Sequence, residues 1–179
     1  MSSESDEILH PARLPVEDLL SDCDVRRQRR SGPGGQHRNK VETAVILTHR
    51  PTGLSAEANE RRSQSENHAQ AVFRLRMVLA MQFRTPGASQ ENEPLPEPSP
   101  LWRQRCVNQR IKIREDHHDL PALLAEVLDL LARSDYDLKA VAEHLESTPS
   151  QLVKFLKIEP KALALINQER QSRGLFPLK

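Results

Sequence analysis

Residues 31–40 read SGPGGQHRNK, and the rest of the chain is organised around this stretch. Three glycines and a proline stand directly before Gln36, so the backbone can approach a ligand closely and no regular helix or strand is expected. Arginines precede the stretch from position 26 onward, and Arg38 and Lys40 close it with no acidic residue in between. The sequence therefore predicts a loop that presents backbone groups to a polyanionic partner.

The segments around the loop predict a small antiparallel sheet. Residues 23–29 are expected to form a basic edge strand, and residues 43–49, TAVILTH, a central strand because they are β-branched and apolar. Residues 50–53, RPTG, supply the proline and glycine of a hairpin turn. The chain then returns over 54–59 as a third strand, so the loop is expected to rise from a sheet.

A helix and a linker follow these strands. Ser63 is expected to cap a helix that runs to about residue 83 and covers the sheet with its apolar face. Residues 85–100, TPGASQENEPLPEPSP, are rich in proline and acidic side chains and lack periodicity, which is typical of a domain linker. Residues 1–15 are polar and acidic and predict a disordered tail.

The C-terminal part is predicted to be helical. Asp119 is expected to cap a leucine-rich central helix, and Thr148 and Pro160 open two later helices. The apolar spacing over 138–155 fits a helix-turn-helix, although Glu146 stands where the turn prefers glycine. A plain helical bundle that docks on protein fits the same residues equally well.

Two side-chain features of this part carry functional hypotheses. Trp102, the only tryptophan, either anchors a core or stacks on a base. His117 and His118 suggest a metal site, but structural sites need about four ligands and no second ligand pair accompanies them. We therefore predict no metal and no cofactor.

The fold class that follows is α+β, with a small antiparallel sheet, a glycine-rich loop and a packed helix, then a linker and an all-α domain. The predicted divisions are the acidic tail over 1–15, the loop-bearing domain over 16–84, the linker over 85–100 and a helical accessory domain over 101–179. The total of 179 residues leaves room for one medium domain or two small ones.

The totals restrict the class of protein further. The net charge is only +1, but acidic side chains crowd the first 24 residues and basic ones follow at once. Two distant cysteines fit a reducing compartment better than a disulfide framework. No apolar run approaches the roughly 20 residues that cross a bilayer, and the acidic start resembles no targeting segment. We expect a soluble, cytoplasmic monomer with no membrane partner.

An ordered set of motifs carries a family resemblance. Residues 31–40 are followed by Thr43-Ala44-Val45, Thr48-His49, Pro51-Thr52-Gly53 and Arg62-Ser63-Gln64 with Asn67. This set, over about residues 22–84, resembles the catalytic GGQ domain of class I peptide chain release factors and their small ribosome-rescue relatives.

The resemblance implies hydrolysis of the ester that joins a nascent peptide to tRNA in the large ribosomal subunit. Gly34, Gly35 and Gln36 are then the catalytic residues, with the backbone amide of Gln36 as the donor that stabilises developing negative charge. The glycines keep the backbone free of side chains at the tRNA end. In this family the glutamine is often methylated, which makes a glutamine methyltransferase that acts on Gln36 a candidate partner.

Basic and polar residues around the loop are expected to contact ribosomal RNA and tRNA phosphates. A solvated charged face is the alternative for such a cluster. The expected RNA-binding residues are Arg27, Arg29, Arg30, His37, Arg38, Asn39, Lys40, Arg62 and Gln64.

The rest of the sequence restricts the ways in which the loop can be brought to the ribosomal active centre. No tripeptide that would read a stop codon can be placed, and residues 173–179 are too apolar and short to act as the basic tail of rescue factors. We expect peptide release without stop-codon reading, with the large subunit and peptidyl-tRNA as partners. The alternative is a nucleic-acid-binding regulator or a ribosome-associated adaptor that uses the helical domain and has no hydrolase activity.

Overall fold

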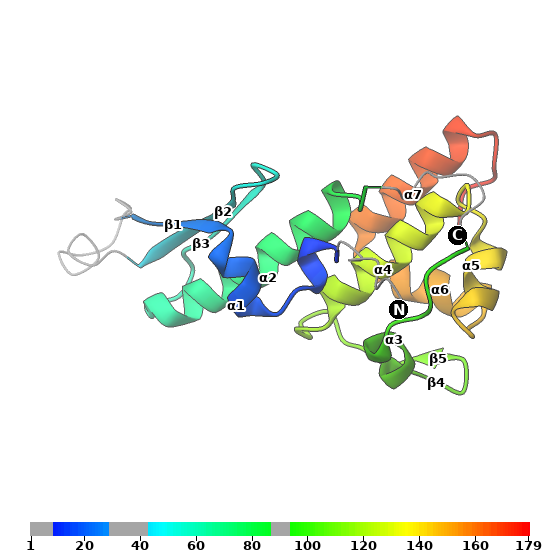
Figure 1. Cartoon of the computed structure of the whole chain (residues 1–179), viewed down its shortest axis with the longest axis horizontal. Helices are drawn as coiled ribbons and strands as arrows, with labels where there is room; N and C mark the ends of the chain where they lie inside the picture. Colours follow the sequence, from blue (N-terminus) through cyan, green and yellow to red (C-terminus); the bar gives the residue numbers. More distant parts are fainter. Residues whose placement is uncertain (1–8, 29–42, 87–93) are drawn as a thin grey trace, which may run out of the picture. The chain divides into compact units, whose positions relative to one another are not determined.

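The computed structural model describes residues 9–28, 43–86 and 94–179 (Figure 1). They form two compact units, which divide between Phe83 and Arg84. We call Leu9–Phe83 the sheet unit and the described residues of Arg84–Lys179 the helical unit. No helix of these described ranges is long and apolar enough to cross a membrane.

The sheet unit contains one three-stranded antiparallel sheet and one long helix. Its elements are η1 (Pro11–Arg13), α1 (Val16–Ser21), β1 (Cys23–Gln28), β2 (Ala44–His49), β3 (Ser55–Ala58) and α2 (Gln64–Gln82). The strand order is β1-β2-β3, so the apolar strand β2 is central and the basic strand β1 lies at an edge. The predicted strands and helix are therefore confirmed, each within about two residues of its expected bounds.

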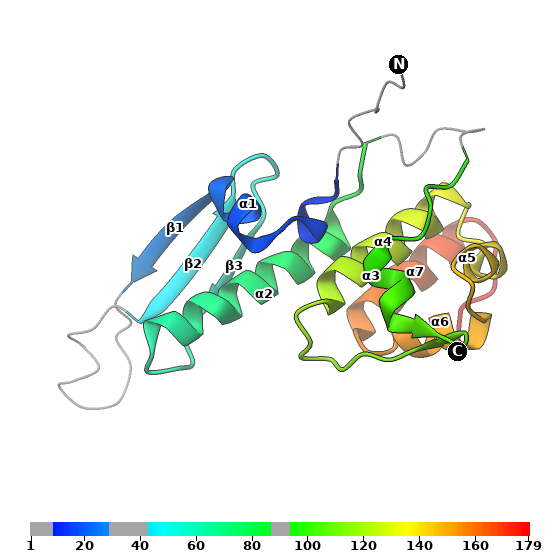
Figure 2. The same cartoon turned by 60° about the horizontal axis from the view of Figure 1, so that its bottom comes forward.

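Helix α2 packs along β2 and β3 (Figure 2). Its N-cap is Ser63, whose side chain accepts a hydrogen bond from the Glu66 amide at 3.4 Å. Leu47 of the central strand and Leu75 and Leu79 of the helix are fully buried. This apolar layer fixes the sheet from which the glycine-rich segment emerges.

The turn between β2 and β3 has the expected chemistry. Gly53 adopts φ +70°, a conformation that side chains disfavour, and its amide donates to the His49 carbonyl at 2.8 Å. The His49 amide donates to the Leu54 carbonyl at 2.8 Å and closes the hairpin. The Pro-Thr-Gly motif therefore sets the register of β3 on β2.

The predicted disordered tail over 1–15 is wrong for residues 10–13, while residues 1–8 lie outside the described ranges. His10 is buried and caps η1 by accepting the Ala12 amide at 3.0 Å. The Arg76 guanidinium donates to the Ala12 carbonyl at 2.8 and 3.0 Å. The Arg76 bonds join residues more than sixty positions apart, so no local sequence pattern could predict them.

The helical unit is built around one buried helix. Its elements are α3 (Pro100–Arg105), β4 (Cys106–Val107), β5 (Arg110–Ile111), α4 (Leu120–Arg133), α5 (Leu138–His144), α6 (Pro149–Leu156) and α7 (Pro160–Ser172). Helix α4 buries every residue from Leu120 to Leu131, as the leucines on several faces predicted. The α+β fold class is confirmed.

The segment predicted as a linker over 85–100 is wrong at its described ends, and residues 87–93 lie outside the described ranges. Thr85 donates its hydroxyl to Asp129 on α4 at 2.7 Å. The Pro96 carbonyl lies 2.9 Å from Nε2 of His144. Ser99 donates its amide and its hydroxyl to the buried Glu126 carboxylate at 2.7 and 2.5 Å. These hydrogen bonds hold the described ends of the proline-rich segment against α4 and α5, and we call residues 85–86 and 94–99 the strap.

Trp102 anchors the core, so the base-stacking alternative is excluded. Its side chain is 1% exposed and lies edge-on to Phe155, with ring centroids 6.0 Å apart. The indole N–H donates to the Leu145 carbonyl at 2.9 Å. The ring thereby fixes α3 to the end of α5.

Candidate functional site

The described part of the candidate site is the stem of the glycine-rich segment. Strands β1 and β2 pair antiparallel up to Gln28 opposite Ala44, which are the last strand residues on either side of that segment. The following predicted site residues lie outside the described ranges: Gly34, Gly35 and Gln36 of the catalytic set, and Arg29, Arg30, His37, Arg38, Asn39 and Lys40 of the RNA-binding set. Their roles stay predictions.

Asn67, in the first turn of α2, holds this stem in place. Its side-chain Nδ2 donates to the Thr43 carbonyl at 2.7 Å and to the Arg61 carbonyl at 2.9 Å. Its Oδ1 accepts the Arg61 amide at 2.9 Å. The side chain is fully buried, so three hydrogen bonds satisfy it where water cannot.

The Asn67 network joins the two chain segments that flank the stem. Thr43 precedes β2, and Arg61 lies in the connection from β3 to α2. One buried amide therefore fixes where the chain enters the central strand and where it turns into the helix. The sequence pattern included Asn67 in the family resemblance but assigned no role to it, because its partners are backbone groups that no side-chain motif reveals.

The structure brings the remaining predicted RNA-binding residues to the stem end of the sheet. Arg27 of β1 is exposed and pairs in register with Val45, which pairs in turn with Ala58 at the end of β3. The chain from Ala58 leads to exposed Arg62 and to half-buried Gln64 at the start of α2.

The nearby acid Glu60 is already neutralised. Arg74 of α2 donates to the Glu60 carboxylate at 2.7 Å, and this hydrogen bond lowers the pKa of Glu60. Arg74 also donates to the Glu57 carbonyl at 2.7 Å. The charge of the carboxylate next in sequence to Arg61 is thus offset by Arg74.

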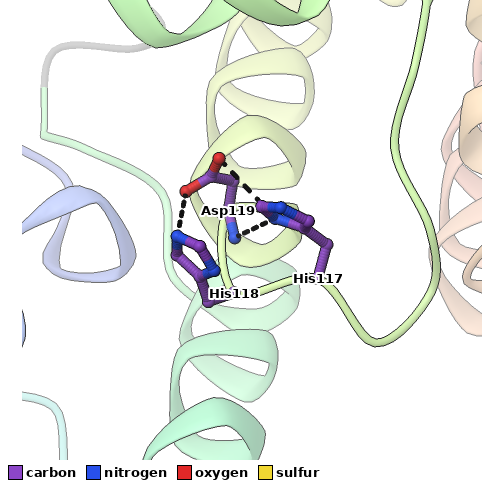
Figure 3. A group of neighbouring side chains, drawn as sticks. All are labelled: His117, His118 and Asp119. Atoms are coloured by element: carbon purple, nitrogen blue, oxygen red, sulfur yellow. Dashed lines mark hydrogen bonds and ion pairs between the residues drawn. The ribbon is translucent and has the colours of Figure 1, made fainter.

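In the helical unit, His117, His118 and Asp119 lie together at the start of α4 (Figure 3). His118 Nε2 is 3.1 Å from one Asp119 oxygen, and Arg105 donates to the other oxygen at 2.5 and 2.9 Å. The Arg105 guanidinium occupies one oxygen of Asp119, and this ion pair accounts for the position of the carboxylate beside the two histidines.

The predicted capping role of Asp119 is wrong. Asp119 occupies the N-cap position of α4, but its carboxylate makes no capping hydrogen bond. The carboxylate is turned to Arg105 instead, because a guanidinium offers two charge-assisted hydrogen bonds where a backbone amide offers one neutral donor. The pair ties the end of α3 to the start of α4.

Comparison with known proteins identifies the family. The RF-1 domain matches residues 17–116, more than half of the chain. This chain belongs to the class I peptide chain release factor family. The RF-1 domain match extends past the expected limit at residue 84 and takes in α3 and the β4–β5 hairpin.

Several release factors align with part of this family member. Chloroplastic peptide chain release factor PrfB1 of Arabidopsis thaliana is 46% identical over 74 residues, 40% of this chain and 15% of that protein. Peptide chain release factor 1 of Nitrosomonas eutropha is 44% identical over 92 residues, 49% of this chain and 23% of that protein. The factor of the same name from Acidiphilium cryptum is 42% identical over 81 residues, 44% and 23% of the two chains. The chain thus spans less than a quarter of the length of these curated relatives.

Proposed function

We propose that this RF-1 domain protein hydrolyses the ester between a nascent peptide and tRNA in the large-subunit active centre, without reading a stop codon. The observation that carries the proposal is the family match over residues 17–116, which contains Gly34-Gly35-Gln36. The relatives that align here are named peptide chain release factors. The hydrolytic domain of the proposal is the sheet unit.

The chemistry requires little of the side chains. Water attacks the ester carbonyl, negative charge grows on oxygen, and a donor placed at that charge lowers the barrier. In the proposal the backbone N–H of Gln36 is this donor, and its amide side chain borders the attacking water. An amide has no useful basicity, so Gln36 is not the general base.

The stem supports this role by fixing the chain on either side of the catalytic segment. The β1–β2 ladder holds Gln28 opposite Ala44, and Asn67 holds the Thr43 carbonyl. Exposed Arg27 and Arg62 at the same end of the sheet supply cations for RNA phosphates. A fixed stem that carries positive charge suits a catalytic segment that acts in a site whose walls are RNA.

Release without a stop codon is the second part of the proposal. Residues 117–179, which follow the RF-1 domain match, form helices with their own buried leucine core. We propose that contacts of this unit and of the stem with the ribosome place the glycine-rich segment in the active centre. The intact stalled ribosome and the separated large subunit are both substrates to test.

The test is a release assay with the full chain and ribosomal complexes that carry labelled peptidyl-tRNA. The complexes present a stop codon, a sense codon or no mRNA in the decoding site, and isolated large subunits form a fourth sample. We expect release that does not depend on the codon. Release confined to stop codons would refute codon independence, and no release from any sample would refute the hydrolase.

Two substitutions separate the backbone and side-chain roles of Gln36. Gln36→Pro removes the N–H and is expected to reduce release by about 10²–10³-fold, the cost of one oxyanion donor. Gln36→Ala keeps the N–H and removes only the side chain that borders the water, so it is expected to reduce release less than Gln36→Pro does, while ribosome binding persists. Gln171→Ala, at an exposed position of α7, is the matched control. Binding without any release would favour the regulator or adaptor instead.

A further inference from the structure

The strand that leaves the β4–β5 turn carries two exposed cations on one face. Arg110 and Lys112 are exposed, whereas Ile111 between them is half-buried. Because alternate side chains of an extended strand point to opposite faces, the two cations share the solvent side. The Lys112 amide donates to the Arg105 carbonyl at 3.0 Å and continues the hairpin pairing beyond β5.

Helix α6 presents a second row of cations. Lys154 and Lys157 are exposed and lie three residues apart, so they share one face of the helix. Ser150, one turn before Lys154, is exposed on the same face. Leu152 and Phe155 point into the core, and the segment 149–157 contains no acidic residue.

The hairpin and α6 are fixed to each other. Strand β5 packs against α6. The Ser147 hydroxyl, in the turn before α6, donates to the Gln109 carbonyl at the tip of the hairpin at 3.1 Å. Trp102, just before the hairpin, donates to the Leu145 carbonyl of the same turn at 2.9 Å. These contacts hold the two rows of cations in fixed positions relative to each other, and we call the four side chains together the basic face.

Ion pairing distinguishes the basic face from the other cations of the hairpin region. Within the described residues, no carboxylate forms an ion pair with Arg110, Lys112, Lys154 or Lys157. Neighbouring arginines are paired: Arg103 with Glu97 at 2.7 Å, Arg105 with Asp119 at 2.5 Å and Arg114 with Asp116 at 3.4 Å. Cations left unpaired on a fixed surface favour a polyanion.

We propose that the basic face, Arg110 and Lys112 with Lys154 and Lys157, binds the phosphate backbone of RNA. Lysine ammonium groups suit phosphates as point charges, and the exposed face of α6 carries no arginine to read base edges in a bidentate way. On α6 the contact is therefore independent of sequence. The choice of RNA rests on the proposed function, whose substrate lies among ribosomal RNA.

The test measures binding of the full chain to a fluorescein-labelled RNA hairpin by anisotropy at several salt concentrations. One double variant is R110E with K112E and the other is K154E with K157E. The control, K139E with K179E, makes the same charge change at exposed positions outside the basic face. Each double variant is expected to weaken binding about tenfold or more and to flatten the plot of log affinity against log salt by about 1.8, as expected for two duplex contacts.

The binding and release measurements together decide the proposal. Wild-type affinity in either double variant, or an equal loss in the control, overturns the basic face as an RNA site. Equally tight binding of a DNA hairpin of the same sequence overturns the assignment to RNA. Peptide release is measured on the same proteins. If the wild type releases no peptide but the double variants bind RNA more weakly than the wild type does, only the proposed function is refuted. A wild type that releases peptide, with double variants that still bind RNA normally, refutes only the basic face.

Discussion

The substitution Asn67→Ala tests the anchoring of the stem most directly. It removes three hydrogen bonds, from Nδ2 to the Thr43 and Arg61 carbonyls and from the Arg61 amide to Oδ1. Each bond contributes about 1 kcal/mol net, so the sheet unit is expected to lose about 3 kcal/mol of its free energy of unfolding. Water that enters the emptied site reduces this loss, whereas backbone groups that stay dry increase it.

The assay uses probes that belong to one unit each. Trp102 is the only tryptophan and reports on the helical unit, while the methyl group of buried Met77 in α2 reports on the sheet unit. Urea unfolding of the full chain is followed by tryptophan fluorescence and by NMR of methionine labelled at the methyl carbon. We expect the Met77 transition of Asn67→Ala to move to lower urea and the Trp102 transition to stay.

A matched amide elsewhere in the sheet unit supplies the control. Asn59 is half-buried and donates a single side-chain hydrogen bond, to Glu57 at 2.8 Å. Asn59→Ala is therefore expected to cost about 1 kcal/mol or less. If Asn67→Ala shifts the Met77 transition no more than Asn59→Ala does, Asn67 does not anchor the stem.

Three further substitutions test other parts of the fold. Ser99→Ala removes a hydroxyl that bonds Glu126 and caps α3, so the free energy of unfolding that Trp102 reports should fall by about 1–2 kcal/mol. An unchanged urea midpoint would show that the strap does not stabilise the helical unit. Glu146→Gly relieves a left-handed φ of 51° and should raise the free energy of unfolding of the helical unit by about 1 kcal/mol. A lower free energy of unfolding would show that the Glu146 side chain stabilises the unit by more than the backbone strain costs. Burial lowers the pKa of His49, so the unfolded chain takes up a proton that the folded one refuses. Stability of the sheet unit should therefore fall as pH drops below about 6.5, and His49→Gln should remove that part of the slope in the Met77 transition.

Local patterns predicted those parts of the fold whose stabilising contacts are close in sequence. The apolar strand 43–49, the turn glycine Gly53 and the N-caps Ser63 and Thr148 all act within a few residues. Hydrophobic periodicity and capping are properties of a short window, so they can be read without the fold.

Contacts that join distant residues could not be predicted in this way. Arg76 holds η1 through a backbone carbonyl, and the Asp119 carboxylate accepts from Arg105 and makes no capping bond to α4. The β4–β5 turn places Asn108 and Gln109 at φ 50° and 64° without glycine, so the usual turn signal was absent. These features depend on which partner the tertiary fold supplies.

For the candidate site, the sequence predicted the residue types and the structure supplied the support. The strands, the turn and α2 of the GGQ context were expected, while the three bonds of Asn67 were not. The basic face was likewise hidden, because its two rows are some forty residues apart and meet only through the packing of β5 on α6.

The edge position of β1 has a consequence for protein handling. Among the described residues β1 pairs only with β2, so its outer side offers backbone donors and acceptors to any other strand. Arg26 and Arg27 on this exposed strand discourage two molecules from joining edge to edge, since like charges would meet. An Arg26→Leu, Arg27→Leu variant is therefore expected to self-associate, and its aggregation would mimic loss of the RNA contact proposed for Arg27. Lysine at both positions keeps the charge that prevents aggregation while removing the planar guanidinium groups.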